Sequence, residues 1–171
     1  SLTMEWIDTL MLEPKPQHKV THLRIHREAM QVRVAQGTSL LCADIVTHQD
    51  TTEALELLRG FRATGRRMVL CDTSQISAGR QLGQSIVAEG GASVLVSCGM
   101  SGREVAIGAR DSGLDLANVV VCRDSRAACE LLACRLLPGD TVLLLGVDQE
   151  GCDRLVDLLD DRAQFSLSAA A

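Results

Sequence analysis

The stretch MVLCDTSQISAGRQLGQSIVAEGGASVLVSCG, residues 68–99, contains one complete strand–helix–strand unit. It opens with an apolar strand at Met68–Cys71 and closes with a second at Ser93–Ser97. Between them a polar loop leads to an amphipathic helix at Leu82–Glu89, which Gly90-Gly91 ends. Continuous apolar strands joined by a helix are typical of a parallel sheet that is covered on both faces.

The same alternation of apolar strands and amphipathic helices continues on both sides of this unit. It predicts further strands at 39–43, 119–122 and 141–145, and further helices at about 51–61, 103–111, 125–137 and 152–159. Upstream, residues 20–34 alternate between apolar and polar with a break at Arg27-Glu28, which predicts an antiparallel hairpin. The predicted fold class is therefore α/β, three-layer and Rossmann-like. Its sheet is mostly parallel, with about six strands and an N-terminal hairpin or antiparallel edge.

Composition narrows the function classes. The chain has 171 residues, 46% hydrophobic and 23% charged, which fits one globular domain. A net charge of -5 and only 2% aromatic residues provide neither a basic surface nor a stacking platform, so no nucleic-acid partner is expected. No apolar run approaches the ~20 residues of a membrane span, so no membrane partner is expected either. Seven cysteines without a CxxC pair suit reduced core thiols and a cytoplasmic location, and their spacing predicts no metal site.

The ends of the chain differ in character from its middle. The first residues, Ser1-Leu2-Thr3, lack an initiating Met, so we expect a cloning remnant ahead of an excised piece of a longer protein. Pro14-Lys15-Pro16 interrupts the helical spacing that precedes it. The predicted organisation is a remnant and linker arm at 1–17, the globular domain at 18–160 and a loose tail at 161–171.

Ligands in parallel α/β sheets bind beyond the carboxyl ends of the strands, so the loops after those ends hold the candidate residues. The richest loop, ADIVTHQD at 43–50, follows the strand at 39–43. It combines carboxylates, an imidazole and a hydroxyl that can orient a base, a ribose or an amine; the candidates are Asp44, Thr47, His48, Gln49 and Asp50. The alternative is that Asp50 or Thr51 caps the next helix and that His48 is solvated.

Two further loops carry candidates. Asp72 ends the strand at 68–71, with the alternative that its carboxylate only bonds the backbone of a local turn. Gly146 and Asp148 follow the last strand in an acidic loop that would repel phosphate. Gly99–Gly102 is either an anion cradle at a helix start or a plain tight turn.

The sequence also lacks the motifs of several enzyme classes. It contains no GxxxxGK[ST], no GxGxxG after a strand and no GxSxG. We therefore predict no catalytic residue and no loop for ATP phosphates within this chain.

Four short motifs follow one another along the chain: LLCAD at 40–44, GRRMVLCD at 65–72, ASVLVSCG at 92–99 and LLPGDTVLLLG at 136–146. With the order of the elements, they make the chain from Leu12 to Leu159 resemble the C-terminal domain of the Mur ligases, most closely of those that add D-Ala-D-Ala. The chain departs from the family pattern in two places, one of them a segment of five residues. Val46–Asp50 stands where the family has Tyr-Asn-Ala-Asn-Pro, and Leu145 stands where it has Lys.

The resemblance implies the substrate- and nucleotide-closing domain of an ATP-dependent amide-bond-forming ligase, inactive alone. The parent enzyme would add an amino acid or D-Ala-D-Ala to a UDP-muramoyl peptide in peptidoglycan precursor synthesis. Its cofactors would be ATP and Mg²⁺, bound mainly by a central domain. The partners would be that central ATP-binding domain, an N-terminal UDP-substrate domain and small-molecule substrates.

Within this chain, the resemblance places Asp44 and the Thr47–Asp50 loop nearest the adenine and the incoming amine. Asp72 and the Gly146–Gly151 loop would line the same cleft. The two departures motivate the alternative, a degenerate ligase-derived domain with a non-catalytic binding or interaction role.

Overall fold

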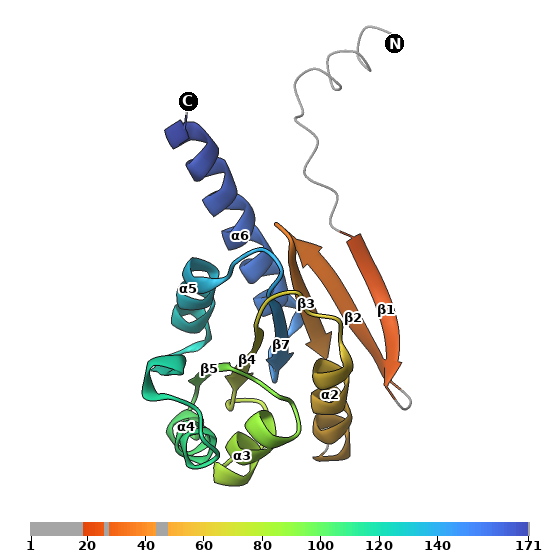
Figure 1. The fold of residues 1–171 in the computed structure, drawn as a ribbon, viewed down its shortest axis with the longest axis vertical. Coiled ribbons are helices and arrows are strands. Elements are labelled where there is room, and N and C mark those ends of the chain that lie inside the picture. The colour runs from red at the N-terminus through yellow and green to blue at the C-terminus, as the bar shows by residue number, and fades with distance from the viewer. Residues whose placement is uncertain (1–18, 26–27, 44–47, 171) are drawn as a thin grey trace, which may run out of the picture.

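The structure is a computed structural model that describes residues 19–25, 28–43 and 48–170, and the side chains of 30–42 and 50–165 (Figure 1). One seven-stranded sheet runs through the molecule in the order β1-β2-β3-β7-β4-β5-β6. The strands are β1 Lys19–Ile25, β2 Glu28–Ala35, β3 Thr38–Ala43, β4 Arg67–Asp72, β5 Val94–Cys98, β6 Val119–Cys122 and β7 Thr141–Leu145. Strands β1, β2 and β3 are antiparallel, and the strands from β3 across to β6 are parallel.

Helices cover both faces of this sheet, which confirms the predicted three-layer α/β class (Figure 1). One face carries α2 His48–Gly60, α3 Arg80–Ala88 and α4 Gly102–Asp111. The other carries α5 Ser125–Arg135 and α6 Gln149–Ala170, and a short 3₁₀ helix, η1 Leu116–Asn118, precedes β6. The sheet has one strand more than the predicted count of about six.

The central strands are apolar throughout because each of their faces meets a helix layer. In β7, Val142 and Leu144 pack toward α5 and α6, while Leu143 and Leu145 pack toward α2, α3 and α4. All four side chains have 0% exposure. Burying each one contributes roughly 1.5–3 kcal/mol, so this strand anchors both cores and fixes the register of its neighbours.

The edge of the sheet opposite the carboxyl ends is held by an ion pair between the exposed Arg66 side chain and the buried Asp140 carboxylate. The Asp140 carboxylate, in a residue 3% exposed, accepts hydrogen bonds from the Arg66 side chain at 2.8 Å and the Leu137 backbone at 3.0 Å. Gly139 precedes it with φ +94, a left-handed conformation that favours glycine. The PGD part of the phrase at 136–146 therefore forms a structural turn, far from the carboxyl ends of the strands.

Helices α3 and α4 pack against each other through two glycines. A Cβ on Gly83 would lie 1.9 Å from the carbonyl oxygen of Val105, and one on Gly108 would lie 1.9 Å from that of Arg80. The two backbones can approach this closely only because both positions lack a side chain. This contact fixes how closely α3 and α4 pack against each other.

Two predicted boundaries are wrong. Helix α2 begins at His48, so Asp50 and Thr51 lie inside the helix and are not its cap. Helix α6 runs from Gln149 to Ala170 and includes most of the residues expected as a loose tail. No proline or glycine interrupts it after Gly151, and Arg162 Nη1 donates to the carbonyl of Ala133 at 2.6 Å. No helix in the described ranges is long and apolar enough to cross a membrane. The expected arm at 1–17 lies outside the described residues.

Candidate functional site

The order of the strands places a topological switch point at the carboxyl edge, and the region beyond the ends of β4 and β7 is here called the crevice. Strand β7 lies between β3 and β4, with Leu145 level with Ala43 on one side and with Cys71 on the other. The loops after β3 and β4 lead to helices on one face of the sheet, whereas the loop after β7 leads to α6 on the other. Adjacent loops that leave in opposite directions form the switch point at which α/β sheets bind ligands.

Two of the predicted site residues meet in this crevice. Gly146 has φ +69, and a Cβ placed on it would lie 2.3 Å from the backbone oxygen of Asp72. A residue with a side chain would therefore push the loop after β7 away from the end of β4. The structure brings the backbones of Asp72 and Gly146 together at the ends of β4 and β7.

The Asp72 carboxylate shapes its own turn. Its Oδ1 accepts hydrogen bonds from the Ser74 backbone N–H at 3.0 Å and from Ser74 Oγ at 2.6 Å, and the residue is 8% exposed. This bears out the turn alternative for the local geometry. Burial raises the pKa of Cys71 to about 12, and the negative charge of Asp72 adds to the effect. Cys71 is therefore a neutral core thiol.

Asp148 begins α6 as its N-cap. Its Oδ1 accepts a hydrogen bond from the Gly151 N–H at 2.8 Å, and its carbonyl accepts one from the Cys152 N–H at 3.0 Å. The side chain is exposed at the crevice. The loop after β7 therefore offers a carboxylate that the helix start holds in a fixed position.

The loop after β3 is described only in part. Asp44 and Thr47 lie outside the described residues. His48 and Gln49 open helix α2, although their side chains are not described, and Asp50 lies half-buried in its first turn.

Sequence reasoning missed Thr73, which fastens the loop after β4 to the loop after β5. Its N–H and its Oγ1 both donate to the Cys98 carbonyl, at 3.0 and 2.8 Å, and its Oγ1 accepts from the Ser101 N–H at 3.0 Å. Gly99 has φ +88, and a Cβ there would lie 2.5 Å from Thr73 Oγ1. This contact makes 99–102 a tight turn and leaves Met100 fully exposed at the edge. A threonine directly after a strand was the available signal.

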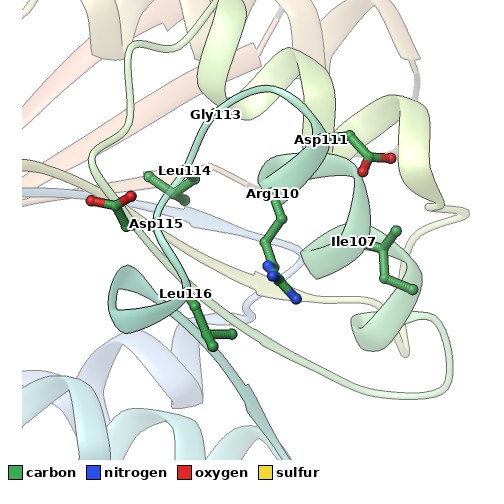
Figure 2. A pocket seen from close by; sticks show the side chains of 7 residues that line it. All are labelled: Ile107, Arg110, Asp111, Gly113, Leu114, Asp115 and Leu116. Carbon is green, nitrogen blue, oxygen red and sulfur yellow. The ribbon is translucent and has the colours of Figure 1, made fainter.

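A shallow pocket lies at the C-terminal end of α4 (Figure 2). It measures about 470 Å³, and its lining includes Arg110, Asp111 and Leu116. None of the predicted site residues lines it. In the described part of the chain, no three His, Cys, Asp or Glu side chains converge as a metal-ligand set.

Comparison with known proteins shows similarity of fold. Sequence comparison finds no matching family model and no similar curated protein. Among solved structures, the chain is similar to a domain assigned to a UDP-N-acetylmuramate:L-alanyl-γ-D-glutamyl-meso-diaminopimelate ligase from Haemophilus ducreyi, at TM-score 0.55 and 13% identity. The matched region covers 75% of this chain and 94% of that domain.

Two longer proteins match as well. A UDP-N-acetylmuramoyl-L-alanyl-D-glutamate–2,6-diaminopimelate ligase matches at TM-score 0.57 and 14% identity over 82% of this chain. The MurF ligase from Thermotoga maritima, solved in complex with ADP, matches at TM-score 0.50 and 14% identity over 79%. This chain spans 33% and 31% of their lengths. The matches confirm the expected likeness to a Mur ligase domain, and at these identities they show the fold alone.

Proposed function

We propose that this chain is the closing domain of an ATP-dependent amide-bond-forming ligase that works in the cytoplasm on peptidoglycan precursors. The parent enzyme would add an amino acid or D-Ala-D-Ala to a UDP-muramoyl peptide. The observation that carries the proposal is the contact of Gly146 with Asp72 at the switch point, in a fold shared with domains of three such ligases. The domains that hold ATP and the UDP-substrate would be its partners.

The residues at the crevice fit an amine or a sugar hydroxyl better than a phosphate. Asp148 presents an exposed carboxylate, and the buried carboxylate of Asp72 adds negative charge. Leu145, which stands where the family has Lys, is 0% exposed and belongs to the core beside α2, so it offers no cation. When bound to the parent, ATP supplies the phosphoryl group that activates the substrate carboxyl. This chain would leave the phosphates and Mg²⁺ to the central domain.

The chain would contribute by positioning and by excluding water. Closure over the central domain would bring the Asp148 carboxylate and the start of α2 toward the incoming amine. An ammonium group held by a fixed carboxylate stays near the activated carboxyl, which converts a bimolecular encounter into an oriented one. Asp44 and the Thr47–Asp50 loop would contact the adenine or the amine from the neighbouring strand end.

The Asp148→Asn variant of the parent enzyme tests the role of this edge. Asparagine caps a helix as well as aspartate does, so the variant keeps the α6 start but loses the charge. We expect the KM for the amine to rise about tenfold, which corresponds to about 1.4 kcal/mol, with thermal stability unchanged.

Asp124→Asn is the matched control, because the Asp124 carboxylate caps α5 by accepting from the Ala127 N–H at 2.8 Å, outside the crevice. Its KM values should equal those of the wild type. Equal KM values for both variants would remove Asp148 from the site.

The buried Leu145 favours one alternative, a degenerate ligase domain that binds or interacts without catalysis. A degenerate parent has no need for an intact upstream phosphate loop. ATP turnover by the full-length protein therefore separates the two proposals.

A further inference from the structure

Strand β6 forms one edge of the sheet. Within the described residues, β5 pairs with one side of β6, and no strand pairs with its other side. The strand reads VVVC over Val119–Cys122, with neither a proline nor a charged residue. Soluble proteins usually protect an edge strand with charges, prolines or bulges, because its open backbone N–H and C=O groups can pair with another strand. The sequence of β6 lacks this protection.

The opposite edge of the same sheet has a different composition. Strand β1 reads KVTHLRI, so a lysine, a histidine and an arginine occur among its seven residues. Such residues discourage one edge strand from pairing with another. The contrast between the two edges indicates that β6 is the edge suited to pairing.

The helix layers leave part of β6 uncovered. Val119 packs against the core beside α4, and Cys122 packs against the core beside α5. Val121, however, is 47% exposed. Leu116, in the 3₁₀ helix η1 that leads into the strand, is 67% exposed. A strand added beside β6 would shield these two apolar side chains from water.

A second copy of this chain fits the edge because β6 is complementary to itself. When two copies of the four-residue strand pair antiparallel over their full length, a two-fold axis passes between Val120 and Val121. The start of each strand then lies beside the end of the other. Asn118, just before β6 of one copy, stands opposite Arg123, just after β6 of the second copy.

The charges at the two ends of β6 match this arrangement. The Arg123 side chain is 88% exposed, and its Nε lies 3.4 Å from Asp124 Oδ2, a surface contact of little strength. Asp115 lies beside Asn118, because its carbonyl accepts from the Asn118 N–H at 2.9 Å, and its side chain makes no capping hydrogen bond. Antiparallel pairing would therefore bring Asp115 of each copy near Arg123 of the other.

The pocket at the C-terminal end of α4 adjoins the start of β6 (Figure 2). Its lining combines Asp115 with the apolar side chains of Ile107 and Leu114. An arginine can lay its apolar stem against such side chains while its charged end meets a carboxylate. Figure 2 shows the Asp115 carboxylate pointing away from Arg110, which lines the same pocket, so Asp115 is open to a cation from outside.

We propose that two copies of this chain associate through antiparallel pairing of their β6 strands, which joins the two sheets into one. The backbone ladder supplies the pairing, and an Asp115–Arg123 ion pair at each end fixes its direction. The four-residue strand is short, so the dimer is weak, with a Kd on the order of 10 µM. The association does not depend on the ligase activity proposed above.

The first test is sedimentation velocity of the full-length protein without ATP or substrate, at concentrations below and above that Kd. We expect the mass to double as the concentration rises. Val121→Lys places like charges close together across the two-fold axis and should raise the Kd at least about tenfold. Because Val121 is half-exposed, its thermal melt should match that of the wild type.

Leu137→Lys is the matched control. Leu137 is 55% exposed and precedes β7, which lies three strands from β6. This variant should dimerise like the wild type. A full-length wild type that stays monomeric, for example because another domain covers β6, would overturn the proposal. A dimer that folded Val121→Lys leaves intact would overturn it as well.

A charge exchange tests the direction of pairing. Asp115→Lys and Arg123→Glu should each raise the Kd about fivefold, because the two-fold axis repeats the lost ion pair. The double variant restores opposite charges across the interface, so its Kd should return to within about twofold of the wild-type value. A double variant that dimerises more weakly than either single variant would overturn the antiparallel arrangement.

Discussion

The backbone oxygen of Asp72 faces the α-carbon of Gly146 so closely that a Cβ on that glycine would lie 2.3 Å away. The ends of two neighbouring parallel strands, β4 and β7, are thereby held in contact. This contact ties the candidate site to the packing of the sheet.

The Gly146→Ala substitution should open this contact. The left-handed backbone at φ +69 costs an alanine about 1 kcal/mol, and relief of the clash adds roughly 1–3 kcal/mol. Urea unfolding measures the loss. Gly91→Ala is the control, because Gly91 has φ +67 and its Cβ would meet only the Arg59 side chain, at 3.9 Å. Equal losses in the two variants would show that the Asp72 contact is unimportant.

The Gly83→Ala and Gly108→Ala substitutions should each destabilise the α3–α4 pair. A methyl group at either position would lie 1.9 Å from a backbone oxygen, so the helices must separate, at a cost of about 3 kcal/mol. Gly60→Ala, in α2 with nothing within 4 Å of its Cβ, should be neutral or slightly stabilising. Thermal melts that rank Gly60→Ala with the other two would contradict the packing described here.

Asp140 should make the domain sensitive to acid. Burial raises the pKa of Asp140, but hydrogen bonds from Arg66 and Leu137 outweigh it and hold that pKa below its ordinary value. A carboxyl whose folded pKa is depressed stabilises the protein above its unfolded pKa of about 3.9, and this stabilisation is lost as the pH falls through the folded pKa.

At pH 7, the free energy of unfolding of the Asp140→Asn variant should be about 2 kcal/mol lower than that of the wild type, so the variant should unfold at a lower urea concentration. It should also lose less stability than the wild type between pH 5 and pH 3. Parallel pH dependences in urea titrations of the two proteins would show that Asp140 does not supply this acid sensitivity. Asp161→Asn, in an exposed position on α6, serves as the surface control.

Thr73→Val should loosen the edge between β4 and β5. The substitution keeps the shape of the side chain but removes the Oγ1 that bridges the Cys98 carbonyl and the Ser101 N–H. A loss of about 1–2 kcal/mol is expected, with faster amide exchange at Ser101. Thr73→Ser keeps the hydroxyl and should exchange like the wild type. Fast exchange in both variants would assign the effect to packing.

Much of the fold could be predicted because the buried strands appear in the sequence as continuous apolar runs. Runs such as Met68–Cys71 and Thr141–Leu145 are apolar on both faces, and only a covered parallel sheet requires that. Helix ends were harder to predict. The start of α2 at His48 and the extension of α6 beyond Leu159 depend on tertiary contacts, such as that of Arg162 with Ala133, which no local signal announces.

For the candidate site, the sequence indicated residues at strand ends but not most of their local contacts. Strand ends pointed to Asp72 and Gly146, and the topology places them together. The turn that Asp72 forms was one of the stated alternatives, whereas the helix cap that Asp148 forms was not predicted. A threonine directly after a strand was a signal for Thr73, but its partners in the neighbouring loop depend on which strands become neighbours.

The most direct test of the proposed function is phosphate release by the full-length gene product. We expect release from ATP that requires both a UDP-muramoyl peptide and an amino acid or D-Ala-D-Ala, and that is lost when the segment described here is deleted. A folded full-length protein that releases no phosphate with any such pair, or one whose release survives the deletion, would contradict the account of this chain as a closing domain.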